Sequence, residues 1–143
     1  MSMYQGGYLI GQIHKRTGRR INELLKEQGI TEFNGAQGTI LYSLWNRESM
    51  TIKEIAAVTG LAKTSLTSML ERMRQAGLLV LEDNPQDGRS KIVKLTGKAG
   101  DLKEEYESVS ASMTECWYRG MQEEEILQFE ETLRKVLRNI EEY

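Results

Sequence analysis

Residues 52–71 read IKEIAAVTGLAKTSLTSMLE, a pattern typical of two short helices joined by a tight turn. A small side chain at Ala56 lets the two helices cross closely, and Gly60 suits a turn position with positive φ. The buried side of this helix–turn–helix would consist of Ile55, Leu61, Leu66 and Met69. An ordinary helical hairpin inside a core has the same spacings, so the spacings alone leave both interpretations open.

The exposed side of the second helix favours nucleic-acid binding. It has hardly any acidic residue before Glu71. Its hydroxyl-bearing and cationic residues are Lys63, Thr64, Ser65, Thr67, Ser68 and Arg72. Hydroxyls bond base edges or phosphates, and an arginine can bind guanine through two parallel hydrogen bonds. A merely solvated face would more often alternate Glu with Lys. We therefore predict that these six residues contact duplex DNA.

A β-hairpin is predicted next. Residues 78–81 and 92–95 are short β-prone runs, and residues 82–90 between them are rich in turn formers, which predicts a long exposed tip. Arg89 and Lys91 follow Asp87, so the hairpin would carry cations that suit a narrow minor groove. The Asp87 carboxylate would hold the Arg89 guanidinium by charge-assisted hydrogen bonds. The alternative is a turn with an Asp cap and incidental surface charge.

Helical patterns flank this central part on both sides. An apolar stripe predicts a first helix that ends near Gln28-Gly29, and Asn34 with Gln37 forms a capping box that opens the second. Thr51 and Glu54 form another. A helix resumes near Thr96 with a heptad-like seam as far as Gly120, and a further helix follows to the C-terminus. The fold class is mainly α with a small β-hairpin. The patterns divide the chain into a first helix (1–30), a lobe with the helix–turn–helix and the hairpin (31–96) and C-terminal helices (97–143).

Composition excludes several classes of protein. The chain has 143 residues, one Cys, one His and a net charge of −2, which rules out a disulfide scaffold and a structural zinc site within one chain. No apolar run reaches the roughly 20 residues of a membrane span, so a cytoplasmic protein is expected. No acid–base or nucleophile–base pairing is visible, so neither an enzyme nor a cofactor is expected. Residues 1–100 carry a charge of +5 and residues 101–143 carry −7.

The chain resembles the winged-helix regulators of the MarR (multiple antibiotic resistance) family. The resemblance lies in the helix–turn–helix, then Gly77-Leu78-Leu79, then the run from Asp87 to Thr96, with Ile30-Thr31 before the second helix. It implies an obligate homodimer. Residues 1–30 and 97–143 would be its interlocking dimerisation helices, and residues 31–96 of each subunit would form the DNA-binding winged lobe that grips a pseudo-palindromic operator in double-stranded DNA. It also implies a transcriptional regulator, usually a repressor, that a small aromatic or phenolic ligand releases.

The sequence says less about the effector. His14, Tyr42, Trp45, Tyr106 and Trp117 are candidate pocket residues, although aromatic residues at helical spacing more often belong to a core. Cys116 raises a redox-sensing alternative, but its place in the seam beside Glu115 favours a buried structural thiol. A winged-helix protein–protein adaptor is a further alternative, supported only by the acidic C-terminal part.

Overall fold

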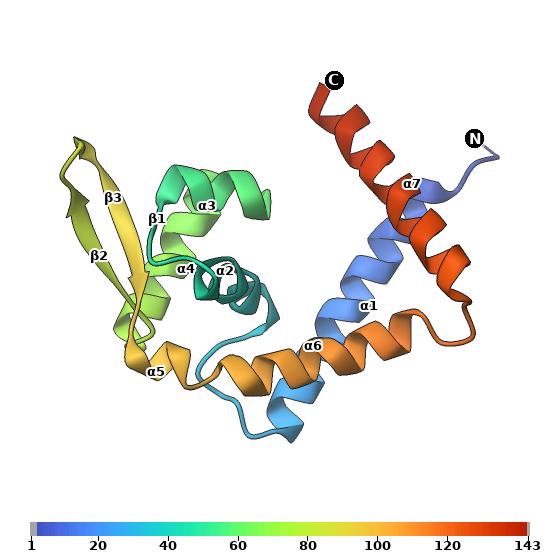
Figure 1. Ribbon diagram of the computed structural model, residues 1–143, viewed down its shortest axis with the longest axis horizontal. Helices are drawn as coiled ribbons and strands as arrows, with labels where there is room; N and C mark the ends of the chain where they lie inside the picture. The colour runs from blue at the N-terminus through green and yellow to red at the C-terminus, as the bar shows by residue number, and fades with distance from the viewer. Residues whose placement is uncertain (1–2, 143) are drawn as a thin grey trace. The chain divides into compact units, whose positions relative to one another are not determined.

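The computed structural model describes residues 3–142, which form seven helices and three strands (Figure 1). The elements are α1 (Gly6–Glu27), α2 (Gly35–Trp45), β1 (Met50–Thr51), α3 (Ile52–Thr59), α4 (Lys63–Gln75), β2 (Leu79–Asn84), β3 (Asp87–Leu95), α5 (Gly97–Gly100), α6 (Lys103–Trp117) and α7 (Glu123–Glu142). They form two compact units, one ending at Ser110 and the other beginning at Ala111. The predicted class, mainly helical with a β-hairpin, is confirmed.

The helix boundaries follow the predicted caps. Asn34 Oδ1 accepts a hydrogen bond from the backbone N–H of Gln37 at 2.9 Å, and Gln37 Oε1 accepts one from the backbone N–H of Asn34 at 3.0 Å. Thr51 and Glu54 make the same reciprocal pair at the start of α3. Gly60 ends α3 with φ of 73°, in the left-handed region where glycine carries no steric penalty. Both capping boxes and the tight turn are therefore confirmed.

The core of the first unit lies between α2, α3, α4 and the sheet. Its fully buried side chains include Ile40, Leu41, Leu44, Met50, Ile55, Leu66, Leu70, Met73, Leu78, Leu79 and Val93. Burying each large apolar side chain contributes about 1.5–3 kcal/mol to folding. Leu66, Leu70 and Met73 commit one side of α4 to this core. The opposite side of α4 is consequently held toward solvent.

The hairpin differs from its predicted form. The three strands have the order β1-β3-β2 and are antiparallel, and Asp83 pairs in register with Lys91. The predicted long tip over 82–90 is wrong, because only Pro85 and Gln86 lie between the strands. The polar residues assigned to a loop pair across the strands instead, with Lys94 Nζ 2.8 Å from Glu82 Oε2 and Lys91 bound to Asp83. Figure 1 shows this hairpin projecting beyond the helices α2 to α4.

The connection after the sheet is also interrupted. The prediction of a single helix from near Thr96 is wrong, because α5 ends at Gly100 and α6 begins only at Lys103. Glycines at 97 and 100 weaken helix formation here. The segment is tied to the end of α4 instead, by Thr96 Oγ1 donating to Gly77 O at 2.6 Å and Lys98 Nζ to Ala76 O at 2.8 Å.

The second unit consists of the end of α6 and the helix α7. Trp117, Tyr118 and Phe129 pack with ring centroids 6.2–6.3 Å apart, and Tyr118 donates its hydroxyl to Glu130 Oε2 at 2.7 Å. Burial and this bond to Glu130 raise the pKa of Tyr118. None of the described side chains of α7 is buried. Across residues 3–142, every helix is too short or too polar to cross a membrane.

Candidate nucleic-acid interface

The outer side of α4 carries all six predicted DNA-contact residues of this helix. Lys63, Thr64, Ser65, Thr67, Ser68 and Arg72 are each exposed. The buried Leu66, Leu70 and Met73 fix the rotation of the helix about its axis, so this polar side cannot turn inward without exposing the core. The exposed side of α4 therefore carries short hydroxyl side chains and two cations, Lys63 and Arg72.

The start of α4 leaves backbone donors available. Its N-cap residue is Ala62, which offers no side-chain acceptor, so the first N–H groups of the helix have no capping hydrogen bond. Free N–H groups at a helix start bind anions such as phosphate, and the helix dipole adds to this attraction. Thr67 donates its hydroxyl to Lys63 O at 2.8 Å, which leaves the Thr67 oxygen as an acceptor. An alanine at the N-cap is the sequence signal for a helix start that lacks a side-chain cap.

Of the two arginines in the last turns of α4, Arg72 is the one that remains available, as Lys63 does at the start of the helix. The other, Arg74, binds Glu71 through two contacts, Nε to Oε2 at 3.0 Å and Nη2 to Oε1 at 2.5 Å. The hydrogen bond from Arg74 lowers the pKa of Glu71, so this carboxylate stays charged and paired near neutral pH. Arg72 has no carboxylate partner among residues 3–142. The spacing distinguishes the two arginines: Arg74 is three residues after Glu71, where helical side chains meet, whereas Arg72 is adjacent to Glu71 and does not face it.

On the hairpin, the Lys91 side chain is paired with Asp83, whereas the Arg89 side chain is not paired with a carboxylate of the described chain. Asp87 Oδ1 accepts a hydrogen bond from the backbone N–H of Arg89 at 3.0 Å. The prediction that Asp87 holds the guanidinium is therefore wrong: the short Asp side chain reaches the backbone two residues on and stabilises the turn. Arg89 is exposed and lacks a carboxylate partner within the described chain. Asn84 Nδ2 donates to Ser90 Oγ at 2.9 Å, which braces the strands behind the tip.

Three of the five candidate pocket residues lie together. The Tyr106 ring has its centroid 5.2 Å from that of Trp45, 6.3 Å from Tyr42 and 5.9 Å from Phe33, which the sequence did not single out. Trp45 Nε1 donates to Ala99 O at 3.0 Å. Burial, and secondarily the charge of Tyr42, raise the pKa of Tyr106. His14 is exposed on α1 and is not part of this aromatic cluster. Trp117 packs in the second unit.

Replacing Gly38 should destabilise the fold around this aromatic cluster. A Cβ atom there would lie 2.5 Å from Tyr106 Cε2, and the rings beside Tyr106 restrict its retreat. We expect Gly38→Ala to lower the free energy of unfolding by about 1–2 kcal/mol, measured by denaturant titration at fixed protein concentration. Gly11→Ala is the control, because its Cβ meets nothing within 4 Å. Equal stability of the two variants would show that the cluster tolerates the methyl group.

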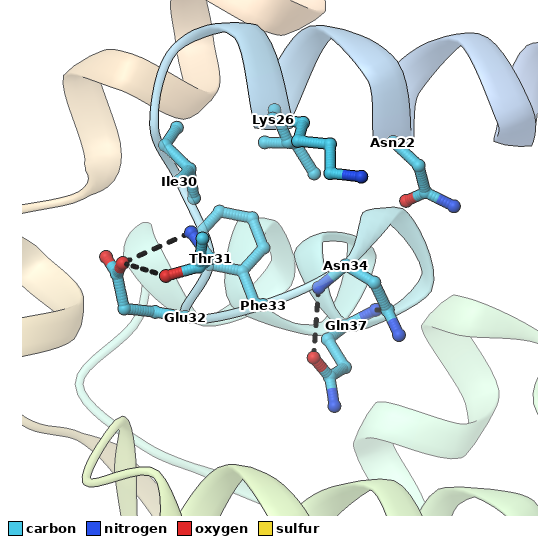
Figure 2. Close-up of a pocket in the computed structure, with 9 residues that line it drawn as sticks. Asn22, Lys26, Ile30, Thr31, Glu32, Phe33, Asn34 and Gln37 are labelled. Carbon is cyan, nitrogen blue, oxygen red and sulfur yellow. Dashed lines mark hydrogen bonds between the residues drawn. The ribbon is translucent and has the colours of Figure 1, made fainter.

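Two open pockets lie beside α2. Figure 2 shows the first, of ≈ 440 Å³, between the end of α1, the following loop and the start of α2; it is lined by Asn22, Leu25, Lys26, Ile30, Thr31, Glu32, Phe33, Asn34 and Gln37. The second, of ≈ 330 Å³, is lined by Thr39, Tyr42, Ser43, Asn46, Arg47, Val58 and Thr59. Tyr42 is the one candidate effector residue among these linings. The structure thus separates Tyr42, which faces a pocket, from Trp45 and Tyr106, which pack behind it.

Cys116 is exposed, so the expectation of a buried structural thiol is wrong. The heptad-like seam stops contributing buried residues after Met113 in the isolated chain, and Cys116 lies one helical turn further along. A thiol must be reachable before an oxidant can modify it, and the Cys116 thiol is reachable in the single chain. Within residues 3–142, no three His, Cys, Asp or Glu side chains are grouped closely enough to hold a metal ion.

Comparison with known proteins identifies relatives over most of the chain. A model described as the MarR family matches residues 33–91. The chain is 30% identical over 132 residues to the multiple antibiotic resistance protein MarR of Escherichia coli (strain K12), which covers 92% of this chain and 90% of that protein. Over 64 residues it is 38% identical to the organic hydroperoxide resistance transcriptional regulator of Bacillus subtilis (strain 168), covering 45% of this chain and only 44% of that regulator.

The fold also matches a solved structure of a DNA complex. A cysteine-to-serine variant of MarR from Escherichia coli, crystallised with operator DNA, superposes with a TM-score of 0.82 at 25% sequence identity. The match covers 96% of this chain and 99% of that one. The helix–turn–helix and the hairpin described above are thus parts of a winged-helix fold, in which the hairpin of β2 and β3 is the wing.

Proposed function

This chain belongs to the MarR family of transcriptional regulators, which are not enzymes, and from that premise we propose that it is a homodimeric, sequence-specific repressor released by a small ligand. Its partner is double-stranded DNA with a pseudo-palindromic operator, and its place of action is the cytoplasm. A repressor of this kind blocks transcription by occupying the operator and leaves it when an effector binds.

The observation that supports DNA binding best is the pairing of α4 with the wing. α4 presents uncapped N–H groups, hydroxyls and Arg72 on one side, and Arg89 stands free at the wing tip. A helix of this kind suits the major groove, where bases show distinct donor and acceptor patterns, while a single arginine suits the narrow minor groove. Asp87 and Lys91 would contribute indirectly, Asp87 by shaping the turn and Lys91 by its charge.

The dimer is supported by large apolar side chains that are exposed on α1 and on α7. On α1, Tyr8, Leu9, Ile10 and Ile13 are exposed, and on α7, Leu127, Val136, Leu137 and Ile140 are exposed. Large exposed apolar patches mark interaction sites in proteins of this size. We assign residues 1–30 and 97–143 to dimerisation and residues 31–96 to DNA binding. A two-fold dimer matches two half-sites of a palindrome, because its symmetry is that of the operator.

The effector site is proposed at the second pocket beside α2. Tyr42, which is 55% exposed, supplies an aromatic wall, and Arg47 supplies a cation for an acidic or phenolic group. The Arg47 Nη1 atom lies 3.9 Å from Glu54 Oε2, a weak pairing that an anionic ligand can replace. Trp45 and Tyr106 would act by holding Tyr42 in place through ring contacts. His14, on α1, would take part only if the partner subunit completes the site.

Binding to duplex DNA tests the proposal directly. Fluorescence anisotropy with duplexes from the region flanking the protein's own coding sequence should show tight binding that weakens steeply with salt. For six to ten phosphate contacts, affinity should fall about 10³–10⁵-fold between 50 and 200 mM salt, because each contact releases condensed counterions. A shuffled duplex of equal length is the control for sequence preference. Failure to bind any duplex at 50 mM salt would favour the protein–protein adaptor instead.

A further inference from the structure

We propose that Asp83 and Glu82 are positioning residues of the wing, which hold Lys91 and Lys94 within the hairpin and thereby limit its affinity for DNA phosphates. The inference rests on the proposed function, since it concerns how strongly the wing binds DNA. It assigns a role to two acidic residues at a surface that would be expected to be basic. It also explains why a wing with three cations presents only one of them, Arg89, without a partner.

The register of the hairpin brings each lysine to a carboxylate. Asp83 stands directly opposite Lys91 on the neighbouring strand, where side chains on the same side of the sheet are close enough to pair. Lys91 Nζ binds Asp83 Oδ1 there. Glu82 stands opposite Ile92, which makes Lys94 its diagonal neighbour, and Lys94 Nζ lies 2.8 Å from Glu82 Oε2.

The two pairs occupy opposite sides of the hairpin. Side chains alternate between the two sides of a strand, so Lys91 shares a side with Val93, while Lys94 shares the other with Ile92. Val93 is buried in the core, so the side with Lys91 is open to DNA only beyond Val93, toward the tip. On both sides, the lysine that DNA would meet is already paired with a carboxylate. Both carboxylates also repel phosphates, since like charges at an interface oppose association.

The electrostatics agree with this geometry. The hydrogen bond from Lys91, with its positive charge, lowers the pKa of Asp83, and the hydrogen bond to Glu82 raises the pKa of Lys94. Asp83 and Lys94 consequently keep their charges near neutral pH. Glu71 holds Arg74 on α4 in the same way, and Arg72 remains free. Carboxylates thus restrain selected cations on both predicted DNA-contact elements.

Removing the Asp83 charge should strengthen binding to DNA of any sequence. Phosphate attraction is independent of sequence, and one added contact changes the logarithm of affinity by about 0.9 per tenfold change in salt. We expect Asp83→Asn to tighten binding to a shuffled duplex about fivefold per wing at 0.1 M salt. The slope of log K against log salt should become steeper by about 0.9 per wing. Glu82→Gln should act in the same direction through Lys94.

A double-mutant cycle separates release of Lys91 from a general change in charge. Asp83→Asn is measured in the natural chain and in a Lys91→Met background by anisotropy over a salt series. If Asp83 acts by holding Lys91, Asp83→Asn should make the salt slope steeper in the natural chain but leave it unchanged in the Lys91→Met background. Glu107→Gln, which removes the same charge from α6, is the control and should change affinity less than twofold. Thermal denaturation confirms that each variant is folded.

Each outcome decides between separate claims. A steeper salt slope in Asp83→Asn that disappears with Lys91→Met supports the positioning role. An unchanged slope in Asp83→Asn, or an equal gain with and without Lys91, overturns it while the unsubstituted protein still binds DNA. Failure of the unsubstituted protein to bind any duplex would instead overturn the proposed function.

Discussion

Two charges placed on the apolar side of α7 should separate the proposed dimer and weaken operator binding about 10²–10⁴-fold. The variant is Leu137→Asp with Ile140→Asp, two residues that are 58% and 70% exposed in the single chain. Such large apolar side chains at the surface of α7 favour burial against a second subunit. A carboxylate in a buried apolar interface has to be desolvated without a partner, which costs several kcal/mol per ion.

The loss of affinity follows from bivalent binding. In a dimer, the second lobe meets its half-site at the effective concentration set by the first, so the two lobes together bind far more tightly than either one. A monomer keeps its α4 and wing but loses this gain. Analytical ultracentrifugation should show a species of about 16.4 kDa, and anisotropy on the same sample should show weak binding with a lower salt slope.

The control variant adds the same two negative charges, but on the polar side of α7. Gln128→Glu with Asn139→Asp also adds two negative charges, and both residues are exposed outside the apolar stripe. This variant should stay dimeric and bind operator DNA almost as the natural chain does. A dimeric Leu137→Asp, Ile140→Asp variant would contradict the assignment of α7 to the subunit interface.

The helices could be predicted from sequence because their signals are local. Asn34 with Gln37, Thr51 with Glu54, and Gly60 each act within a few residues, so short spacings identify them. The orientation of α4 followed from its apolar period. These features locate the proposed DNA-contact surface before any tertiary contact is known.

The missed features depend on contacts between distant segments. Strand β1 has two residues and exists only through pairing with Val93 and Ile92 on β3. The strands of the wing are longer than predicted because Asp83 and Glu82 find lysines on the opposite strand, although each residue alone favours a turn. The pairing of Arg74 with Glu71 is different, because its i,i+3 spacing on α4 is a local signal. Cys116 was expected to be buried because a seam pattern shows which side a residue faces, but not where its packing partners end.

Arg89→Ala should weaken binding to operator and shuffled duplexes alike, by about 50-fold at 0.1 M salt for a dimer with two wings. Arg89 is the wing cation left without a carboxylate partner in the described chain, so its charge is available to DNA. Losing one phosphate-neutralising contact per wing should also lower the salt slope by about 1.8. Anisotropy titrations over a salt series measure both quantities.

The fold should survive this change, which makes the result interpretable. The turn uses the backbone N–H of Arg89, donated to Asp87 Oδ1, and alanine keeps that donor. The thermal midpoint of Arg89→Ala should therefore match that of the natural chain. Arg19→Ala, an exposed arginine on α1 that the DNA-contact surface does not include, controls for the change in net charge.

A conservative variant then distinguishes charge from shape at the same position. A planar guanidinium suits a narrow minor groove better than a strongly hydrated ammonium group does. Arg89→Lys should therefore restore the salt slope while recovering only part of the affinity. Full recovery would identify Arg89 as a simple phosphate contact. Unchanged affinity in Arg89→Ala would remove the wing from the DNA interface altogether and leave α4 as its only element, since no other wing cation is free to replace the lost charge.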